Sequence, residues 1–493
     1  MGHLCDSGLM VTGIMLSKVL GEWWHRGDGP AHRQLADRVQ VLVLDGRLPL
    51  RTRLPAEREL ATTLGLSRGT VTTAYDALRE SGFIASKRGA GSWVELPARP
   101  RQVTPSWSLT PYGGSVADTF IDMAHAAPGA PTGDLYPAVQ AAVARLPEFL
   151  PAHGYYGNGI EMLRGAIADR YTRRGLPTRA DQIMVCAGAQ HGISLVLAAF
   201  VAAGDRIVVE HPAYPAIFDA IRQVSCRAVP VALTALGWDL DLVEATVAQT
   251  APRLAYFIPD FHNPTGLCMD AEQRIRLARL AHRRQTLLLI DESMVELGLE
   301  HPAPPPVGAG LPLSVQENLV HLGSTSKTFW GGLRVGWIRG QSELLHRLAV
   351  VRAGTDLASP VLEQLITVEL LEQADDILPR RNKELADRRD QLTALVRERF
   401  PGWSVPHPPG GLNLWIDLAA PVSSMLALTA GRYGLQLAAG PRFGVDGAFE
   451  TRLRLPYTLN AEDTVTAVDR LAAAASGMGG ATAPSVAPAT GLV

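Results

Sequence analysis

The positions of apolar residues divide the chain into a small helical head and a longer region where strand-like and helical runs alternate. Residues 31–45 carry apolar side chains at a period near 3.6, and Gly46 ends that pattern. The clearest strand-like runs further along are residues 183–185, 206–209, 254–258 and 286–290. Strands that alternate with helices imply a mostly parallel sheet covered on both faces. The expected fold class of this longer region is therefore α/β.

The head has the pattern of a helix-turn-helix. A second helix is expected after Leu54, with Pro55 in its first turn, where a missing N–H costs little. Gly65 then breaks the chain, and Ser67 is suited to cap a third helix over residues 68–81. Two helices joined by so short a turn are typical of this motif.

A basic hairpin is expected directly after the third helix. Residues 83–86 and 92–94 have the pattern of two short strands, and the tip between them is Lys-Arg-Gly-Ala-Gly. Such a hairpin is a wing. The third helix opens with small polar residues and one arginine, which suits contact with base edges and phosphates. The alternative is a small helical domain with a solvated charged face, but helix, turn, helix and wing in order favour DNA binding.

These patterns set the expected domain boundaries, because composition changes sharply between the segments. A stretch rich in Pro, Ser and Gly suits a linker, and a terminal stretch of Gly, Ala, Pro and Thr suits disorder. The segments in chain order are an extension with a short apolar helix over residues 16–24 (1–27), the winged head (28–95), a linker (96–115), the body (116–476) and a disordered tail (477–493).

Composition narrows the class of protein. The 493 residues are 47% hydrophobic and 19% charged, with a net charge of −2, so any nucleic-acid binding must come from a local patch. Residues 28–99 carry 11 Lys and Arg against 8 Asp and Glu, which suits a basic head. The 4 cysteines form no disulfide framework, so we expect the reduced cytoplasm. No apolar run suits a membrane span, and no metal site is expected.

The candidate chemistry of the body centres on a lysine between small hydroxyl residues. Lys327 stands in the run Gly-Ser-Thr-Ser-Lys-Thr. A lysine that forms an imine must be deprotonated by its surroundings. Ser324 and Ser326 can hydrogen-bond a phosphate, and Arg334 can pair with it by charge. Most lysines are solvated surface charges, so this interpretation depends on the residues that accompany Lys327.

Four further groups follow strand-like runs of the body. Asp291 ends such a run, where a carboxylate can hold a pyridine nitrogen protonated or simply cap a helix. Asn263, in Asn-Pro-Thr-Gly, can donate to a ring oxygen or mark a turn. Ala189 and Gln190 open an apolar helix, whose first N–H groups suit a phosphate. Tyr214 is placed to cover a flat cofactor.

The head resembles the winged helix-turn-helix domain of GntR-type regulators. The resemblance rests on the run L-P-A-E-R-E-L-A, followed by L-G-L-S-R-G-T-V and A-Y-D-A-L-R-E-S-G-F-I, and it covers residues 30–95. It implies that the protein binds double-stranded operator DNA. The DNA-binding residues implied in this way are Arg58, Ser67, Arg68, Thr70, Arg88 and Gly89.

The body resembles the fold-type-I aminotransferases over residues 121–475, because its five motifs occur in the order and spacing of that family. The resemblance implies pyridoxal 5'-phosphate as cofactor, with Lys327 as its covalent anchor. It also implies that Asp291 pairs with the pyridine nitrogen, Asn263 binds the phenolic oxygen and Tyr214 stacks on the ring. The implied phosphate ligands are Ala189, Gln190, Ser324, Ser326 and Arg334.

Two further roles follow from the same resemblance. Tyr155, with Tyr156 as the alternative, is similar to the tyrosine that reaches the phosphate of a neighbouring subunit, which implies a homodimer. Arg454, with Arg452 as the alternative, is similar to the arginine that binds the α-carboxylate of an amino acid. The sequence departs from the family at Met294, which stands where the family has a tyrosine.

A GntR-like head joined to an aminotransferase-like body is the architecture of the MocR family of bacterial regulators, which the chain resembles over nearly its whole length. The resemblance implies a cytoplasmic, homodimeric transcription regulator that senses pyridoxal phosphate or an amino acid or amine effector. The alternative is an active aminotransferase whose DNA-binding head is incidental. Both the head and Met294 favour regulation over physiological turnover.

Overall fold

The computed structural model describes residues 10–21, 23–24, 30–44, 47–87, 91–95 and 120–478. The expected linker over residues 96–115, the wing-tip residues Arg88 and Gly89, and the tail from residue 479 onward lie outside these described residues. Within the described ranges, no helix is both long enough and apolar enough to cross a bilayer.

The head is a winged helix-turn-helix, as its sequence pattern predicts. Its elements are α2 (Ala31–Leu44), α3 (Glu57–Leu64), α4 (Arg68–Glu80) and the antiparallel strands β1 (Ile84–Lys87) and β2 (Gly91–Val94). Ser67 caps α4, because its side chain accepts a hydrogen bond from the Thr70 N–H at 3.1 Å. The second helix begins at Glu57, later than the position of Pro55 suggested. Pro55 instead offers its carbonyl to the Tyr75 hydroxyl at 3.0 Å.

The N-terminal helix belongs to the core of the head. This helix, α1, spans Gly13–Leu20 rather than residues 16–24, since Thr12 caps its start and Gly21, at φ +64°, ends it. Leu16 and Leu20 are fully buried against the other helices of the head. The structure therefore places α1 in the folded head, although the sequence analysis assigned it to a separate extension.

The body contains an eight-stranded sheet whose central strands are parallel. Its order is β4 (Ile183–Cys186), β11 (Gly336–Arg339), β10 (Leu319–Ser324), β9 (Leu287–Asp291), β8 (Leu254–Phe257), β5 (Arg206–His211), β6 (Arg227–Thr234) and β7 (Gly237–Trp238). The strands from β10 through β6 run parallel to one another, while β11 and β7 are antiparallel to their neighbours. The predicted α/β class is confirmed.

Helices cover both faces of this sheet. On β5, Ile207 and Val209 face the core under α7 (Ala189–Phe200), α8 (Pro215–Gln223) and α12 (Ser342–Ala353), while Val208 faces the core under α9 (Leu240–Thr250) and α10 (Ala271–Arg284). Successive strand side chains point to opposite faces, so a continuous apolar run fills both cores.

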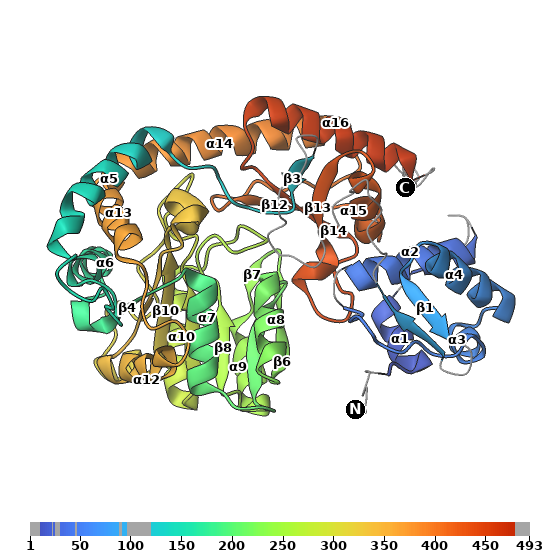
Figure 1. Ribbon diagram of the computed structural model, residues 1–493, viewed down its shortest axis with the longest axis horizontal. Coiled ribbons are helices and arrows are strands. Elements are labelled where there is room, and N and C mark those ends of the chain that lie inside the picture. The colour runs from blue at the N-terminus through green and yellow to red at the C-terminus, as the bar shows by residue number, and fades with distance from the viewer. Residues whose placement is uncertain are drawn as a thin grey trace, which may run out of the picture.

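A second, smaller sheet forms the C-terminal part of the body. Its order is β12 (Asn413–Asp417), β14 (Arg452–Pro456), β13 (Leu435–Ala439) and β3 (Ile121–Met123), and it packs with α14 (Ala374–Arg399), α15 (Ser423–Gly431) and α16 (Ala461–Gly477). The remaining long helices are α5 (Thr132–Arg145), α6 (Glu161–Arg173) and α13 (Val361–Glu372). Figure 1 shows this small-sheet unit between the large sheet and the head.

We predict that Leu16→Ala destabilises the head by about 2–5 kcal/mol, because it removes buried methyl groups and leaves a cavity. Native-state hydrogen exchange of amides in α2 and α4, in the full-length protein, measures the effect. Met15→Ala is the matched control: Met15 lies on the same helix with 54% of its surface exposed, so we expect a change within about 0.5 kcal/mol. Equal protection in both variants would contradict the placement of α1 in the core.

Candidate functional site

The candidate site lies at the carboxyl ends of the parallel strands. Asp291 ends β9, Asn263 follows β8, and Tyr214 follows β5. Parallel strands place their carboxyl ends along the same sheet edge, so residues far apart in sequence meet there. Lys327 follows β10 in a π-helical turn, Ser326–Trp330.

Lys327 carries an amine whose pKa is displaced toward neutrality. Its Nζ donates a hydrogen bond to the Ala126 carbonyl at 2.8 Å. Burial and next the positive charges of Arg454 and Arg334 lower the pKa of Lys327, Asp291 opposes them, and the net pKa is about 8. A larger fraction of the amine is therefore neutral at physiological pH than for a solvated lysine, and the neutral amine is the nucleophile.

Asp291 is held by a tyrosine that the sequence analysis did not single out. Asp291 is buried, and its Oδ2 accepts a hydrogen bond from the Tyr256 hydroxyl at 2.6 Å. Burial raises the pKa of Tyr256, and the adjacent Asp291 carboxylate raises it further, so the phenol stays protonated and donates. The Ser293 N–H also donates to Asp291 Oδ1, at 2.9 Å. These two bonds fix the orientation of the carboxylate.

The phosphate-cradle candidates come together around the start of α7. Gly188 precedes Ala189 with φ +86°, and a Cβ built there would lie 3.1 Å from Arg334 Nη2. Arg334 donates to the Ala187 carbonyl at 2.9 Å, which holds its guanidinium beside the helix start. The hydroxyl oxygens of Ser324 and Ser326 lie 3.0 Å apart. Backbone N–H groups, hydroxyls and one cation form a suitable anion site.

Asn263 meets a residue from the small sheet. It is buried, and its Oδ1 accepts a hydrogen bond from Asn413 Nδ2 at 3.4 Å. The contact occupies the carbonyl oxygen of Asn263, so its amide N–H group is the one that suits a ligand oxygen. The Oδ1 of Asn413 is buried without a hydrogen-bond partner among the described residues. Asn413 was missed because its strand carries no motif around it.

Arg454 is the buried cation of β14, and the structure brings it rather than Arg452 close to Lys327. It donates to the Ala124 carbonyl, and its Cζ lies 5.1 Å from the centroid of the Phe443 ring. Burial, and next the neighbouring Arg442, lower the pKa of Arg454 to about 10. Its Nε is buried without a partner among the described residues, which suits a carboxylate ligand. Arg452 instead pairs with Asp417 at 3.0 Å.

The candidate tyrosines and Met294 lie in different surroundings. Tyr214 directly precedes α8 and is half-buried at the edge of the large-sheet core. Tyr155 has 65% of its surface exposed and lies against His153, while Tyr156 packs edge-on against Phe149. Among the described residues, the side-chain contact found for Tyr155 is with His153 rather than with another residue of the candidate site. Met294 is buried in the apolar cluster that also contains Ala126.

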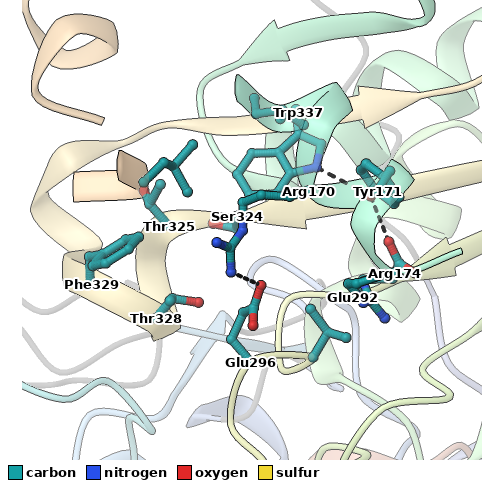
Figure 2. Close-up of a pocket in the computed structure, with 13 residues that line it drawn as sticks. Arg170, Tyr171, Arg174, Glu292, Glu296, Ser324, Thr325, Thr328, Phe329 and Trp337 are labelled. Atoms are coloured by element: carbon teal, nitrogen blue, oxygen red, sulfur yellow. Dashed lines mark hydrogen bonds and ion pairs between the residues drawn. The ribbon is translucent and has the colours of Figure 1, made fainter. Parts of the chain in front are cut away.

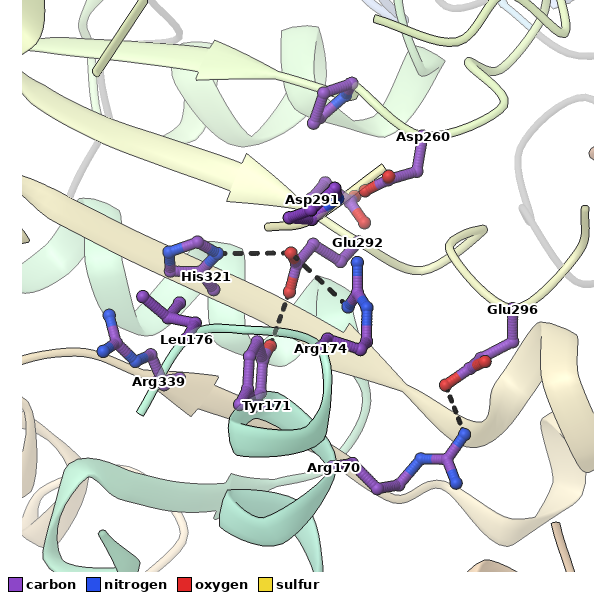
Figure 3. Close-up of polar contacts among 12 residues, drawn as sticks. Arg170, Tyr171, Arg174, Leu176, Asp260, Asp291, Glu292, Glu296, His321 and Arg339 are labelled. Atoms are coloured by element: carbon purple, nitrogen blue, oxygen red, sulfur yellow. Dashed lines mark hydrogen bonds and ion pairs between the residues drawn. The ribbon is translucent and has the colours of Figure 1, made fainter. Parts of the chain in front are cut away.

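A buried polar network lies behind Asp291, as Figure 3 shows. Glu292 Oε2 accepts from the Tyr171 hydroxyl at 2.6 Å, and His321 Nδ1 lies 3.3 Å from Glu292 Oε1. Burial raises the pKa of Glu292, but His321, Arg174 and the Tyr171 hydrogen bond outweigh it and bring that pKa to about 2. The network ties α6 to β9 and β10, and so supports the strand that carries Asp291.

A small cavity borders this network (Figure 2). Its volume is about 30 Å³, and its lining includes Ser324, Thr328 and the ion pair between Arg170 and Glu296. That volume suits one or two water molecules rather than a cofactor. The cavity is therefore part of the support behind the candidate site.

Three of the candidate DNA-binding residues of the head lie at the start of α4, and Arg58 lies on α3. Ser67 and Arg68 are exposed at the start of α4, Thr70 is half-exposed beside them, and Arg58 is exposed on α3. Such a helix start suits entry into the major groove. Arg88 and Gly89 lie outside the described residues, so their predicted contacts stay predictions.

Comparison with protein families separates the same two regions. Residues 31–94 match the family "Bacterial regulatory proteins, gntR family", and residues 122–471 match "Aminotransferase class I and II". The HTH-type transcriptional regulator YisV of Bacillus subtilis is 27% identical over 89% of this chain and 95% of its own length. The probable rhizopine catabolism regulatory protein MocR of Rhizobium meliloti is 29% identical, and the match covers 76% of this chain and 79% of that protein.

A solved structure matches the body. LysN, the alpha-aminoadipate aminotransferase of Thermus thermophilus, was crystallised with N-(5'-phosphopyridoxyl)-L-leucine. It is 26% identical to this chain, with a TM-score of 0.66, and the match covers 73% of this chain and 93% of LysN. The family model for aminotransferases, which matches residues 122–471, likewise leaves out the winged head.

We predict that the Lys327 amine titrates with a midpoint near pH 8 in cofactor-free protein, below its ordinary value of 10.5. The amine is protonated and unreactive below that midpoint and nucleophilic above it. Acetylation rates measured by mass spectrometry across pH report the midpoint, with Lys383, exposed on α14, as an internal comparison. Arg454→Gln removes a neighbouring positive charge, so the midpoint should rise. A wild-type midpoint near 10.5 would show that the amine is not desolvated.

Proposed function

The chain belongs to the aminotransferase class I and II family and carries a GntR-family head, and we propose that it is a transcription regulator that binds pyridoxal 5'-phosphate. The two domains together are the architecture of the MocR family. The observation that carries the cofactor proposal is the Lys327 amine, with its lowered pKa, grouped with Asp291, Arg334 and Arg454 at the carboxyl edge of the sheet.

The described residues fit this cofactor in charge and in hydrogen-bonding groups. Gly188 leaves room for an anion beside Arg334, since a Cβ there would approach the guanidinium to 3.1 Å. The buried, unpartnered Nε of Arg454 suits a second anionic group, such as the carboxylate of an amino acid. When bound, pyridoxal phosphate supplies an aldehyde that condenses with primary amines, which makes it a reporter of amino acids or amines.

Each residue of the site has a proposed task. Lys327 is the covalent anchor, Asp291 keeps the pyridine nitrogen protonated with the support of Tyr256, and Asn263 donates to the phenolic oxygen. Tyr214 covers the ring. The phosphate is held by Ala189, Gln190, Ser324, Ser326 and Arg334. Arg454 binds the carboxylate of an amino acid effector.

The exposed Tyr155 suits a role at the phosphate of a second subunit, so we propose a homodimer. Two heads in one dimer would bind two half-sites of an operator, which raises the effective concentration of the second contact. Because the partner is DNA, we propose that the protein acts in the cytoplasm.

An active aminotransferase with an incidental head is the alternative, and one observation bears on it. Met294 stands at the position of the family tyrosine and is buried among apolar side chains. A methionine carries no hydroxyl, so none is offered at this position. That absence removes a proton donor from beside Lys327 and favours sensing over turnover. We therefore propose that physiological transamination does not occur.

We predict that purified protein mixed with pyridoxal phosphate gains a visible absorption, and that borohydride removes it and leaves the cofactor attached to Lys327. Lys327→Ala should lose this covalent link and stay folded. Lys383→Ala, a surface control on α14, should behave as wild type. Absorbance spectra and peptide mass spectrometry give the result. A wild-type protein that stays colourless with added cofactor would overturn the cofactor proposal.

We predict that Arg68→Ala weakens binding to a duplex selected by the wild type from a random pool. The loss should be about 1–3 kcal/mol if Arg68 contacts a base. If Arg68 contacts only phosphate, the slope of affinity against salt should become shallower. Fluorescence anisotropy at several salt concentrations distinguishes these cases, with Lys383→Ala as control. Unchanged affinity and unchanged slope would remove Arg68 from the interface.

A further inference from the structure

The head rests on the small-sheet unit through a buried ion pair. Figure 1 shows α2 of the head beside α15 of the body, and these two helices are in contact. Arg38, on α2, pairs with Glu450, and the two side chains are only 7% and 13% exposed. Arg38 Nε also donates to the Leu20 carbonyl at 2.9 Å, which orients the guanidinium toward the body. A buried charge depends strongly on its partner.

Glu450 is built into the body at the same time. Its Oε2 accepts a hydrogen bond from the Ser424 N–H at 3.0 Å, and its carbonyl accepts from the Ser423 N–H at 3.0 Å. Both donors lie in the first turn of α15, where a carboxylate is favoured by the helix dipole. Any movement of Glu450 therefore disturbs both the start of α15 and the partner of Arg38.

The loop that carries Glu450 also approaches the candidate cofactor site. The centroid of the Phe449 ring lies 4.5 Å from that of His211 and 5.8 Å from that of Trp415. The ring centroids of Trp415 and Phe443 lie 5.2 Å apart. Phe443 in turn lies under the Arg454 guanidinium. Packed aromatic rings thus connect the carboxylate-binding candidate to the residue next to Glu450.

The same loop contacts the residue that precedes the ring-stacking candidate, Tyr214. The Phe443 carbonyl accepts a hydrogen bond from the Ala213 N–H at 2.8 Å, directly before Tyr214. Val445 N–H donates to His211 Nε2 at 3.1 Å. The segment over residues 440–450, which we name the relay loop, therefore contacts both edges of the site and the head.

We propose that the surface formed by α15 and the relay loop is the docking surface of the DNA-binding head, and that ligand binding at Arg454 changes how Arg38 and Glu450 hold the head there. The second half of this inference rests on the proposed function, because it requires a ligand in the site. A ligand that engages Arg454 moves the Phe443 ring or fixes it. That change reaches Glu450 through Phe449 and alters the freedom of α2.

The decisive variant is Glu450→Gln, which keeps an oxygen to cap α15 and removes the charge that pairs with Arg38. Two measurements on the full-length protein are needed: hydrogen exchange of α2 amides, and affinity for the selected duplex with and without saturating N-(5'-phosphopyridoxyl)-L-leucine, which offers a carboxylate to Arg454 as well as the phosphate. In wild type we expect this adduct to change DNA affinity by about 5- to 150-fold. In Glu450→Gln, α2 amides should exchange faster and the affinity ratio should fall toward one.

The matched control is Asp417→Asn, which removes another carboxylate of the small-sheet unit. Asp417 pairs with Arg452 at 3.0 Å, and both side chains are about one-third exposed. This variant should keep the wild-type affinity ratio and the wild-type exchange of α2. Arg38→Met, alone and combined with Glu450→Gln, completes a double-mutant cycle. If one ion pair carries the effect, the double variant behaves like the single variants.

The outcomes separate this inference from the proposed function. A wild type without the borohydride-sensitive absorption overturns the proposed function, and the α2 exchange of Glu450→Gln still tests the docking surface. A wild type that binds the adduct and responds, together with a Glu450→Gln variant that responds equally with unchanged α2 exchange, overturns this inference alone. An adduct-bound wild type with unchanged DNA affinity and α2 exchange overturns it as well.

Discussion

The gathering of positive charge around a single carboxylate is the constraint on which the rest of the site depends. Arg454 and Arg334 both lower the pKa of the buried Lys327 amine, and the Asp291 carboxylate opposes them. Like charges in such surroundings are costly unless an anion joins them. Two observations reflect that cost: the pKa of Lys327 is lowered, and the Nε of Arg454 has no hydrogen-bond partner among the described residues. A ligand with a phosphate and a carboxylate relieves it at two places.

Both sheets contribute residues to this site. The large sheet supplies the lysine, the aspartate and the phosphate cradle from the ends of its strands, while the small sheet supplies Arg454 and Asn413. The hydrogen bond between Asn263 and Asn413 therefore joins two separately packed cores. Because α2 of the head contacts α15 of the small-sheet unit, the part of the body that supplies Arg454 also supports the DNA-binding domain.

Sequence alone predicted the residues that motifs mark and missed those that tertiary register selects. Lys327, Asp291 and Asn263 each follow a recognisable strand, and the common edge of a parallel sheet brings them together. Tyr256 sits inside an apolar strand, and its role follows only from the pairing of β8 with β9. The Ala126 carbonyl has no sequence signature at all. Arg38 and Glu450 lie 412 residues apart, so no local pattern connects them.

The burial of α1 matters when the head is transferred to another protein as a DNA-binding domain. The GntR match begins at residue 31, yet Leu16 and Leu20 complete the apolar interior of the head. A hybrid regulator assembled from residues 31–94 would expose the apolar surface that α1 covers, and exposed apolar surfaces promote aggregation. For the design of biosensors or chimeric repressors, the exchangeable unit of this protein therefore starts at about residue 10, upstream of its conventional border.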